Sequence, residues 1–215
     1  MKKYSHTLIF LHAFTYVPEN NKYYIDKIKK ILPKDVVLKV IYPKAPLRKI
    51  TCYNGRIYTA WFDYFTKYNY KKECINEIQL LNIRKRLHKI IDKEIKYHNN
   101  NPKKIFIGGY SQGCSMAMDM GITYPRKLGG IIGFKGDIPN ITDESRHKQD
   151  IWVCHGKKDD TIGFNVAKES YDKYKNKYNF DITFLRQKNA NHNENTGIFE
   201  QMRSLKIWLN HRISV

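Results

Sequence analysis

The sequence has few cysteines, and their spacing suggests neither cross-links nor a metal site. Its 215 residues include four cysteines, which are widely scattered and form no C-x-x-C pair and no zinc-like pattern. Reduced thiols in a cytoplasmic protein fit this usage best. We expect neither a metal ion nor an organic cofactor, because nothing in the sequence suggests one.

Long hydrophobic runs are missing as well. No stretch approaches the ~20 apolar residues that a membrane-spanning helix needs. The apolar run at residues 8–11 is too short for a signal peptide and no small-x-small cleavage site follows it, so a first buried strand is the better interpretation. Hydrophobic residues make up 41% and aromatic residues 13% of the chain, which excludes disorder. The sequence therefore predicts one packed domain, residues 1–215, in the cytoplasm.

Acidic residues are scarce relative to basic ones. The chain has 39 Lys and Arg residues against 20 Asp and Glu residues, which gives a formal net charge of +19. Such an excess attracts anionic lipid surfaces and nucleic acid. However, lysines are spread along the whole chain, as in a general composition bias, and no nucleic-acid-binding motif is visible. We keep peripheral contact with anionic membranes as a minor hypothesis and expect no nucleic-acid binding; no feature predicts an oligomeric state.

Strand-like and helix-like segments alternate along the chain. Apolar runs predict strands at residues 5–11, 36–41, 104–110, 129–134, 151–154 and 181–185. Helical apolar spacing predicts helices at residues 18–32, 74–98, 164–177 and from 198 onwards, together with one that follows residue 111 and ends at Tyr124-Pro125. Residues 42–63, 140–150 and 186–195 are expected to be loops. The alternation predicts an α/β fold with a mainly parallel sheet covered by helices on both faces.

One segment combines a strand, a sharp turn and a helix. An apolar run ends in Gly109-Tyr110-Ser111-Gln112-Gly113, a G-x-S-x-G sequence, and passes directly into helical spacing. The two glycines remove Cβ atoms that would collide in such a turn, and the first N–H groups of the helix would lie beside the serine oxygen. The five residues alone also match unreactive turns. With its flanking elements, the segment predicts a serine nucleophile; Cys114 is interpreted as a small buried residue of the helix.

Two further polar groups follow later strands, where a parallel sheet binds its ligands. Asp159 and Asp160 follow one strand, and His192 lies in a polar loop after the next. The order Ser, Asp, His is that of α/β-hydrolases. We interpret His192 as the base that takes the proton of Ser111 and Asp159 as the carboxylate that orients the imidazole, with Asp160 as a solvated or capping neighbour. His12 and His155 are interpreted as structural loop residues.

The ordered motifs resemble those of the acyl-protein thioesterase, lysophospholipase and carboxylesterase family of small α/β-hydrolases. The resemblance runs from about Leu8 to the last helix. The segments that carry it are Ile9-Phe10-Leu11-His12, Tyr42-Pro43-Lys44-Ala45-Pro46, Ala60-Trp61-Phe62-Asp63, the G-Y-S-Q-G elbow, Gly136-Asp137-Ile138-Pro139, His155-Gly156-x-x-Asp159, and Thr183-Phe184 at eight residues before His192.

This resemblance implies a set of site residues. Ser111 would be the nucleophile, Asp159 the acid and His192 the base, which favours Asp159 over its neighbour. The backbone N–H groups of Gln112 and Phe14 would form the oxyanion hole.

The resemblance also implies a reaction. Family members cleave thioesters of S-acylated proteins, or carboxyl esters of lysolipids and small acyl substrates. We therefore expect a serine hydrolase that removes acyl groups from proteins through an acyl-enzyme, with a lysophospholipase or small-ester carboxylesterase as the alternative. The loop around Trp61 would help to line the acyl groove, and a packed aromatic that anchors this loop is an equally good interpretation of Trp61.

The first loop departs from the family pattern. Where the family has H-G-L-G-D, this chain has His12-Ala13-Phe14-Thr15-Tyr16, without either glycine or the acidic residue. Loss of a single oxyanion donor typically costs ~10²–10³ in rate. A non-catalytic protein that has kept an acyl pocket is therefore an alternative, although the complete triad argues against it. A basic protein that binds anionic surfaces is a third interpretation.

Overall fold

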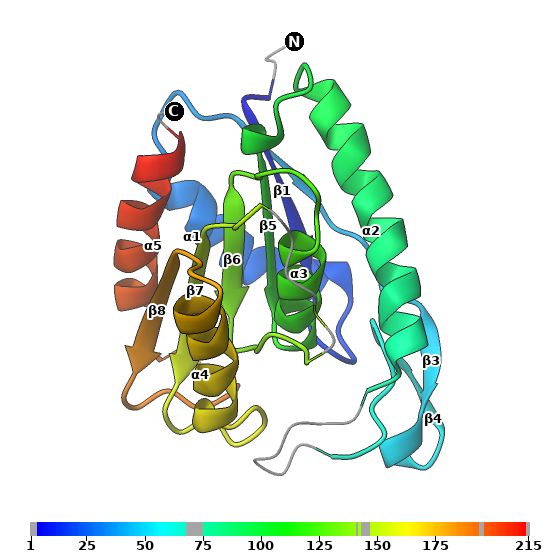
Figure 1. The fold of residues 1–215 in the computed structure, drawn as a ribbon. Coiled ribbons are helices and arrows are strands. Elements are labelled where there is room, and N and C mark those ends of the chain that lie inside the picture. Colours follow the sequence, from blue (N-terminus) through cyan, green and yellow to red (C-terminus); the bar gives the residue numbers. More distant parts are fainter. Residues whose placement is uncertain (1–3, 68–74, 141, 143–146, 194–195, 214–215) are drawn as a thin grey trace.

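The computed structural model describes residues 4–67, 75–140, 142, 147–193 and 196–213. Its centre is a six-stranded sheet in the order β2-β1-β5-β6-β7-β8 (Figure 1). Each pair of neighbouring strands in this sheet is parallel. The strands are β1 (His6–Leu11), β2 (Leu38–Ile41), β5 (Ile105–Tyr110), β6 (Gly130–Phe134), β7 (Ile151–Gly156) and β8 (Ile182–Gln187).

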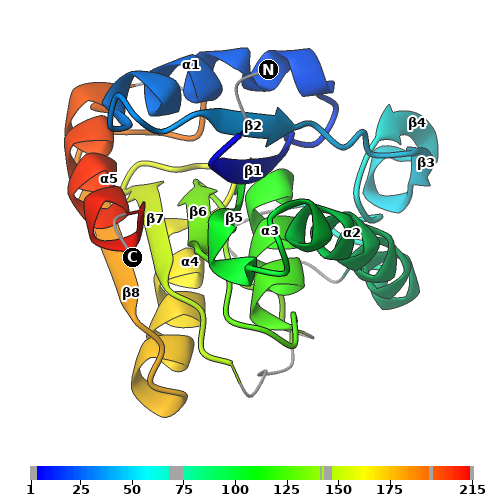
Figure 2. The same cartoon turned by 90° about the horizontal axis from the view of Figure 1, so that it is seen from above.

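Helices cover both faces of the sheet (Figure 2). One face is covered by α1 (Lys22–Ile31) and α5 (Ile198–Ile213), the other by α2 (Glu77–Tyr97), α3 (Gln112–Ile122) and α4 (Phe164–Asp172). A π-helical segment, Lys173–Lys177, extends α4, and 3₁₀ helices lie at Pro18–Asn21, Thr51–Tyr53 and Pro102–Lys104. The predicted α/β fold with a doubly covered parallel sheet is confirmed. No helix in the described part of the chain has the length and hydropathy needed to span a lipid bilayer.

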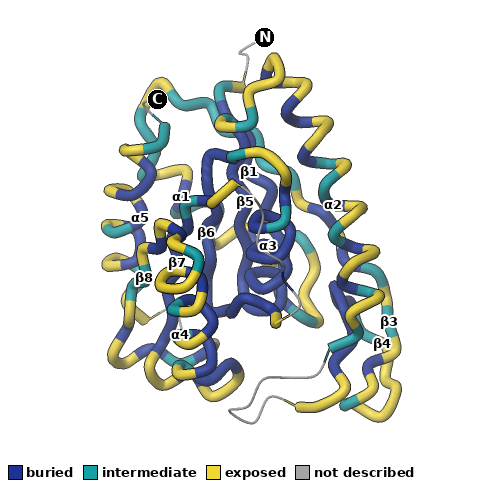
Figure 3. The backbone as a smooth tube through the Cα atoms, viewed as in Figure 1, coloured by how far each residue is buried: buried dark blue, intermediate teal, exposed yellow. Residues whose placement is uncertain are grey.

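The strand β5 is buried on both faces, which explains why its sequence is apolar without interruption. Ile105 and Ile107 pack in a cluster with residues of α2 and α3, whereas Phe106 and Tyr110 pack in another cluster with residues of α1 and α5. Successive side chains of a strand point to opposite faces, so a sheet that is covered on both sides needs apolar residues at every position. Figure 3 shows the result, with buried central strands and exposed outer faces of the helices.

Residues 42–63 are not irregular throughout, and our expectation of a loop was wrong there. β3 (Leu47–Ile50) and β4 (Arg56–Thr59) form an antiparallel hairpin beside one end of α2 (Figure 1). Asn54 and Gly55, with φ angles of 55° and 72°, lie in its turn. The Asn-Gly turn signal was present, but Leu47 and Ile57 are exposed and the strands contain no apolar run, so periodicity did not reveal them.

The remaining elements agree with the prediction apart from their ends. The helix predicted over 74–98 begins at Glu77, after Asn76, whose side chain accepts a hydrogen bond from the N–H of Gln79. Cys74 lies outside the described residues, as do residues 141, 143–146 and 194–195 of the predicted loops. β7 and β8 each continue two residues beyond the predicted ends, which places His155 in β7.

Candidate active site

Ser111 lies in the sharp turn between β5 and α3. Its backbone has φ 54° and ψ −123°, a conformation that residues with a side chain rarely adopt. A Cβ atom on Gly109 would lie 2.3 Å from the carbonyl oxygen of Gly113, and a Cβ atom on Gly113 would lie 2.3 Å from that of Leu11. The two glycines are therefore required by close backbone contacts, as the motif predicted.

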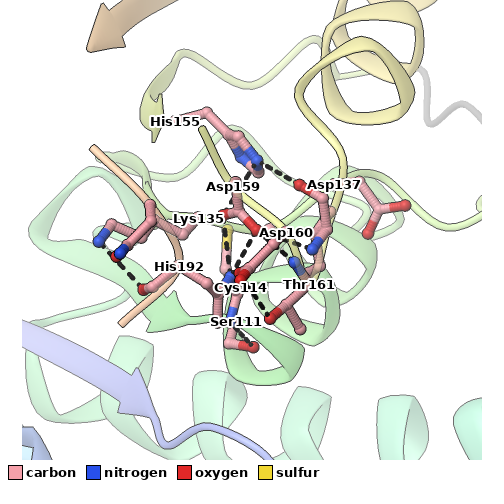
Figure 4. A network of polar contacts seen from close by, with 12 residues as sticks. Ser111, Cys114, Lys135, Asp137, His155, Asp159, Asp160, Thr161 and His192 are labelled. Carbon is pink, nitrogen blue, oxygen red and sulfur yellow. Dashed lines mark hydrogen bonds and ion pairs between the residues drawn. The ribbon is translucent and has the colours of Figure 1, made fainter. Parts of the chain in front are cut away.

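Three side chains that are far apart in the sequence meet at the carboxyl end of the sheet (Figure 4). His192 Nε2 is 2.8 Å from Ser111 Oγ, and His192 Nδ1 is 3.0 Å and 2.8 Å from the two carboxylate oxygens of Asp159. All three residues are buried. Asp160 is exposed instead, and its carboxylate accepts a hydrogen bond from the hydroxyl of Thr161 at 3.4 Å.

The surroundings of Asp159 keep its carboxyl group ionised. The N–H groups of Thr161 and Ile162 donate to its Oδ1 at 3.0 Å and 2.8 Å. Burial raises the pKa of this carboxyl, but the hydrogen bond and charge of His192, together with His155 and the Ile162 N–H, outweigh burial and leave the pKa below its usual value. An ionised Asp159 binds a protonated Nδ1 of His192. The Nε2 atom is then free to accept the proton of Ser111.

His155 also contacts the carboxylate. Its Nε2 donates to the carbonyl of Ile162 at 2.7 Å and lies 3.3 Å from Asp159 Oδ2. Burial lowers the pKa of His155, so the ring is neutral at physiological pH. His155 therefore packs beside Asp159, and it belongs to the end of β7 rather than to a loop, as the sequence had suggested.

The loop after β1 lacks the two family glycines, and hydrogen bonds to the β3–β4 hairpin hold it instead. Thr15 has a φ of 67°, a left-handed conformation that costs a β-branched residue of the order of 1–3 kcal/mol. Its N–H donates to the carbonyl of Thr59 on β4 at 3.0 Å, and the Thr59 hydroxyl donates to the carbonyl of Tyr16 at 2.7 Å. These contacts with the hairpin offset the strain in the loop.

The same loop orients the backbone N–H of Phe14. His12 Nε2 accepts the N–H of Ala45 at 3.0 Å, so the ring proton is on Nδ1, which donates to the carbonyl of Ala13 at 2.8 Å. The N–H of Tyr16 donates to the same carbonyl at 3.2 Å. In a trans peptide the carbonyl and the following N–H point in opposite directions. The bound carbonyl of Ala13 therefore fixes the direction of the Phe14 N–H.

Gln112 contributes both a backbone donor and a side-chain bridge. It is the first residue of α3, so its N–H has no acceptor within the helix. Its side chain accepts the N–H of Trp61 at 2.9 Å and donates to the carbonyl of Phe62 at 2.8 Å. Within the described part of the chain, neither this N–H nor that of Phe14 has a hydrogen-bond acceptor.

Trp61 does not line a groove beside Ser111. Its side chain is fully buried, and its Nε1 donates to the carbonyl of His12 at 2.8 Å. The two rings lie 4.9 Å apart. Tyr53 and Tyr64, from the segment around Trp61, line the cavity beside Ser111, but the expectation fails for Trp61 itself, because a fully buried side chain has no surface to present to a substrate. The alternative interpretation, an aromatic that anchors the loop, agrees with these contacts.

A cavity of about 350 Å³ opens beside the triad, a size typical of small-molecule sites. Ser111 and His192 line it, and so do Phe14, Tyr53 and Tyr64. The ring of Phe14 lies 5.7 Å from that of Tyr53 and 5.8 Å from that of Tyr64. We call these three rings the aromatic wall. The sequence predicted a loop at residues 42–63 and did not single out Tyr53 or Tyr64.

The carbonyl of His192 accepts two hydrogen bonds from side chains that the sequence did not indicate. Tyr110 Oη donates to it at 2.5 Å, and Lys135 Nζ donates to it at 3.0 Å. Lys135 is buried and follows directly after β6. Both donors bind a backbone atom, which any residue type could offer. The sequence therefore indicated them only by position: Tyr110 ends a strand next to the elbow, and Lys135 follows a strand next to Gly136-Asp137.

The chain has a nucleophile elbow, a mainly parallel sheet, and an acid and a base that follow two later strands. This combination defines the α/β-hydrolase fold. Comparison with known proteins adds the family. Residues 1–210 match the sequence profile of the phospholipase/carboxylesterase family, and the chain belongs to this family.

Individual relatives carry related names. Acyl-protein thioesterase 1 of Schizosaccharomyces pombe is 38% identical over 102 residues, which are 47% of this chain and 44% of that protein. Lysophospholipase-like protein 1 of Mus musculus is 26% identical over 98% of this chain and 88% of its own. This chain spans about half the length of several curated relatives that it matches. The crystal structure of Arabidopsis thaliana SOBER1 has a TM-score of 0.84 and 24% identity, over 97% of this chain and 99% of that one, and shows the same fold.

These comparisons confirm the expected family and fold. The names of the relatives, which are thioesterases, a lysophospholipase-like protein and carboxylesterases, describe hydrolases of esters and thioesters.

Proposed function

We propose that this protein is a serine hydrolase that cleaves acyl thioesters and esters through an acyl-enzyme, and that its substrates are S-acylated proteins. The observation that carries the proposal is the 2.8 Å contact between His192 Nε2 and Ser111 Oγ, with Asp159 bound to the opposite ring nitrogen. A serine hydroxyl becomes a useful nucleophile only when a base accepts its proton during attack.

The reaction runs in two stages on the same residues. Ser111 Oγ attacks the carbonyl carbon while His192 Nε2 takes its proton, and Asp159 stabilises the imidazolium. The N–H groups of Phe14 and Gln112 stabilise the oxyanion of the tetrahedral intermediate. His192 then gives the proton to the departing sulfur or oxygen, which leaves the acyl group on Ser111. A water molecule gives a proton to His192 as its oxygen attacks this ester. The bond between the acyl carbon and Ser111 Oγ then breaks, His192 returns the proton to Oγ, and the carboxylic acid leaves.

Two alternative functions are compatible with the same site. The aromatic wall suits an apolar acyl chain on any carrier, so a lysophospholipase or small-ester carboxylesterase would use the same machinery. A non-catalytic acyl binder would have no need for the oriented Phe14 N–H or for the complete triad. The left-handed Thr15 and the bound carbonyl of Ala13 support retention of the oxyanion site despite the altered loop sequence.

Labelling with a fluorophosphonate probe tests the nucleophile. We expect wild-type protein to be labelled and Ser111→Ala to lose both labelling and turnover, with a fall in kcat of the order of 10⁵–10⁶. Cys114→Ala is the control, because burial raises the pKa of this thiol to about 12 and prevents it from acting as a nucleophile. Folded wild-type protein that takes up no label would instead support the non-catalytic binder.

A comparison of carriers tests the substrate class. Turnover is measured on a palmitoylated peptide, a lysophospholipid and a short-chain ester under the same conditions. Protein deacylation predicts the highest kcat/KM for the peptide. A clear preference for the lysophospholipid or the short ester would replace this part of the proposal with the corresponding alternative.

We also propose that the protein works in the cytoplasm and contacts anionic membranes peripherally through its +19 charge. Attraction of this kind is screened by salt. Binding to vesicles that contain anionic lipid should therefore weaken between low and high ionic strength, and it should persist in Ser111→Ala. Equal sedimentation with neutral and anionic vesicles would contradict a charge-based contact.

A further inference from the structure

A second cavity adjoins the catalytic one. It has a volume of about 210 Å³ and is lined by three asparagines and four tyrosines. Tyr16, Tyr110 and Asn193 line both cavities. A substrate bound at Ser111 can therefore extend past these shared residues into the smaller cavity, which we call the asparagine-tyrosine subsite.

The general acid determines which part of the substrate lies there. His192 must give its proton to the leaving atom, so the leaving group lies on the His192 side of the bond that breaks. Asn193 follows His192 directly, and the ring of Tyr110 lies 5.7 Å from the imidazole. The asparagine-tyrosine subsite is therefore on the leaving-group side of the bond that breaks. The acyl chain then lies on the opposite side, along the aromatic wall.

The lining of the subsite is polar and neutral. Among the residues that the structure describes, no charged side chain lines this cavity. Asn20 Oδ1 accepts the N–H of Val17 at 2.8 Å, which leaves its Nδ2 as a donor. The side-chain amide of Asn193 has no protein partner within the described residues. Amide side chains offer both donors and acceptors, which match the alternating N–H and C=O groups of a peptide.

Exposed aromatic surface completes the subsite. Tyr16 and Tyr23 are 40% and 37% exposed, and the ring of Tyr16 lies 6.4 Å from that of Tyr110. Tyrosine combines an apolar ring with a hydroxyl and suits contact with peptide segments. Lys27 Nζ lies 5.7 Å from the centroid of the Tyr23 ring, but Lys27 does not line the cavity. Among the described lining residues a phosphorylated headgroup would find no cationic partner, so the composition of the lining favours a neutral leaving group.

We propose that the asparagine-tyrosine subsite binds the peptide backbone next to the acylated cysteine of a protein substrate. The inference rests on the proposed thioesterase function and specifies how that function selects its substrate. The cysteine sulfur lies between Ser111 and His192, the acyl chain lies along the aromatic wall, and the flanking peptide amides bind Asn20 and Asn193.

Two thioesters with the same octanoyl chain test the proposal. One carries it on the cysteine of a neutral, blocked pentapeptide, and the other carries it on 2-mercaptoethanol. The measured quantity is the ratio of the two kcat/KM values for the full chain. We expect the wild-type ratio to exceed ten and the double variant Asn20→Ala/Asn193→Ala to lower it about tenfold, because each of the two neutral hydrogen bonds lost corresponds to a factor of about three. Asn82→Ala, at an exposed position on α2, is the matched control and should keep the wild-type ratio.

The possible outcomes separate the subsite from the proposed function. If the double variant lowers both kcat/KM values equally, the asparagines act only on the position of His192 and the subsite is overturned. A wild-type ratio near one also overturns it, as does a lysophospholipid whose turnover depends on the same asparagines more than that of the peptide. Absence of turnover on both thioesters, together with absence of probe labelling at Ser111, would overturn the proposed function as well.

Discussion

At the scale of single residues, Trp61 connects the segment that follows the β3–β4 hairpin to the loop after β1, which carries Phe14. Its Nε1 donates to the carbonyl of His12, and its backbone N–H donates to the side chain of Gln112. Gln112 and Phe14 are the two expected oxyanion donors; Gln112 is itself a partner of Trp61, and Phe14 lies two residues from the other partner, His12. Trp61 is therefore a positioning residue for both.

Replacement of Trp61 by Phe tests this role. The change removes the donor to His12 and leaves a buried carbonyl unsatisfied, which costs about 1–3 kcal/mol of unfolding free energy. We expect kcat to fall about tenfold, less than the ~10²–10³ that follows complete loss of an oxyanion donor. Since the side chain does not touch the cavity, the fall should be equal for esters of short and long acyl chains.

Tyr53→Leu is the matched comparison, because Tyr53 belongs to the aromatic wall. It should change the ratio of long-chain to short-chain turnover. A Trp61→Phe variant that shifts this ratio as Tyr53→Leu does would restore the groove-lining role that the structure argues against.

At the scale of elements, the elbow was predicted well and the hairpin was not. The elbow needs glycine at position 109 because of a contact with Gly113 four residues away, and at position 113 because of a contact with Leu11 on β1. Both requirements leave a strict G-x-S-x-G pattern within five residues, although the second contact is not local. The β3–β4 hairpin has exposed apolar residues at Leu47 and Ile57. Its role is to hold the loop after β1, through the hydrogen bond between Thr15 and Thr59. The sequence of residues 42–63 gives no indication of a hydrogen-bond partner that lies more than 40 positions away.

The same distinction applies to the loop that carries the base. Its position after β8 was predicted from the order of the elements. The two donors to the His192 carbonyl come from the ends of β5 and β6, and they bind a backbone atom that every residue type has. The sequence therefore indicated where the base lies but not what holds it.

At the scale of the whole molecule, buried histidines make stability depend on pH. His6, at the start of β1, packs against Phe106 with ring centroids 6.0 Å apart, and its Nε2 is 3.4 Å from Lys104 Nζ. Burial, followed by the charges of Lys104 and His98, lowers its pKa to about 4 despite the opposing charge of Asp35. Burial likewise lowers the pKa values of His12, His88 and His155.

These pKa shifts predict a loss of stability on acidification. Between the unfolded pKa of 6.5 and the folded value of about 4, the unfolded chain binds more protons at His6 than the folded chain does. The contribution is complete above pH 6.5 and is lost as the pH falls toward 4. It amounts to about 3 kcal/mol, because one pKa unit corresponds to about 1.4 kcal/mol.

Urea unfolding of His6→Gln at several pH values provides the measurement. We expect the unfolding free energy of the variant to fall less steeply than that of wild type over this range, by about 3 kcal/mol in total. His211→Gln, at an exposed position on α5, should keep the wild-type slope. Parallel curves for wild type and His6→Gln would show that this imidazole has no part in the pH dependence.

The sequence by itself determined the alternation of strands and helices, the turn at Ser111 and the order of serine, aspartate and histidine. These features follow from side-chain periodicity, from glycines that close backbone contacts require and from chain direction, and each can be recognised in a short stretch of sequence or in the order of such stretches. Only the tertiary structure decided that Trp61 anchors a loop, that Tyr110 and Lys135 bind the carbonyl of His192, and that a neutral polar cavity adjoins the catalytic one. Each of these depends on which distant segments meet when the sheet forms, and a residue type that contacts only a backbone atom or an open cavity leaves no pattern in its own neighbourhood.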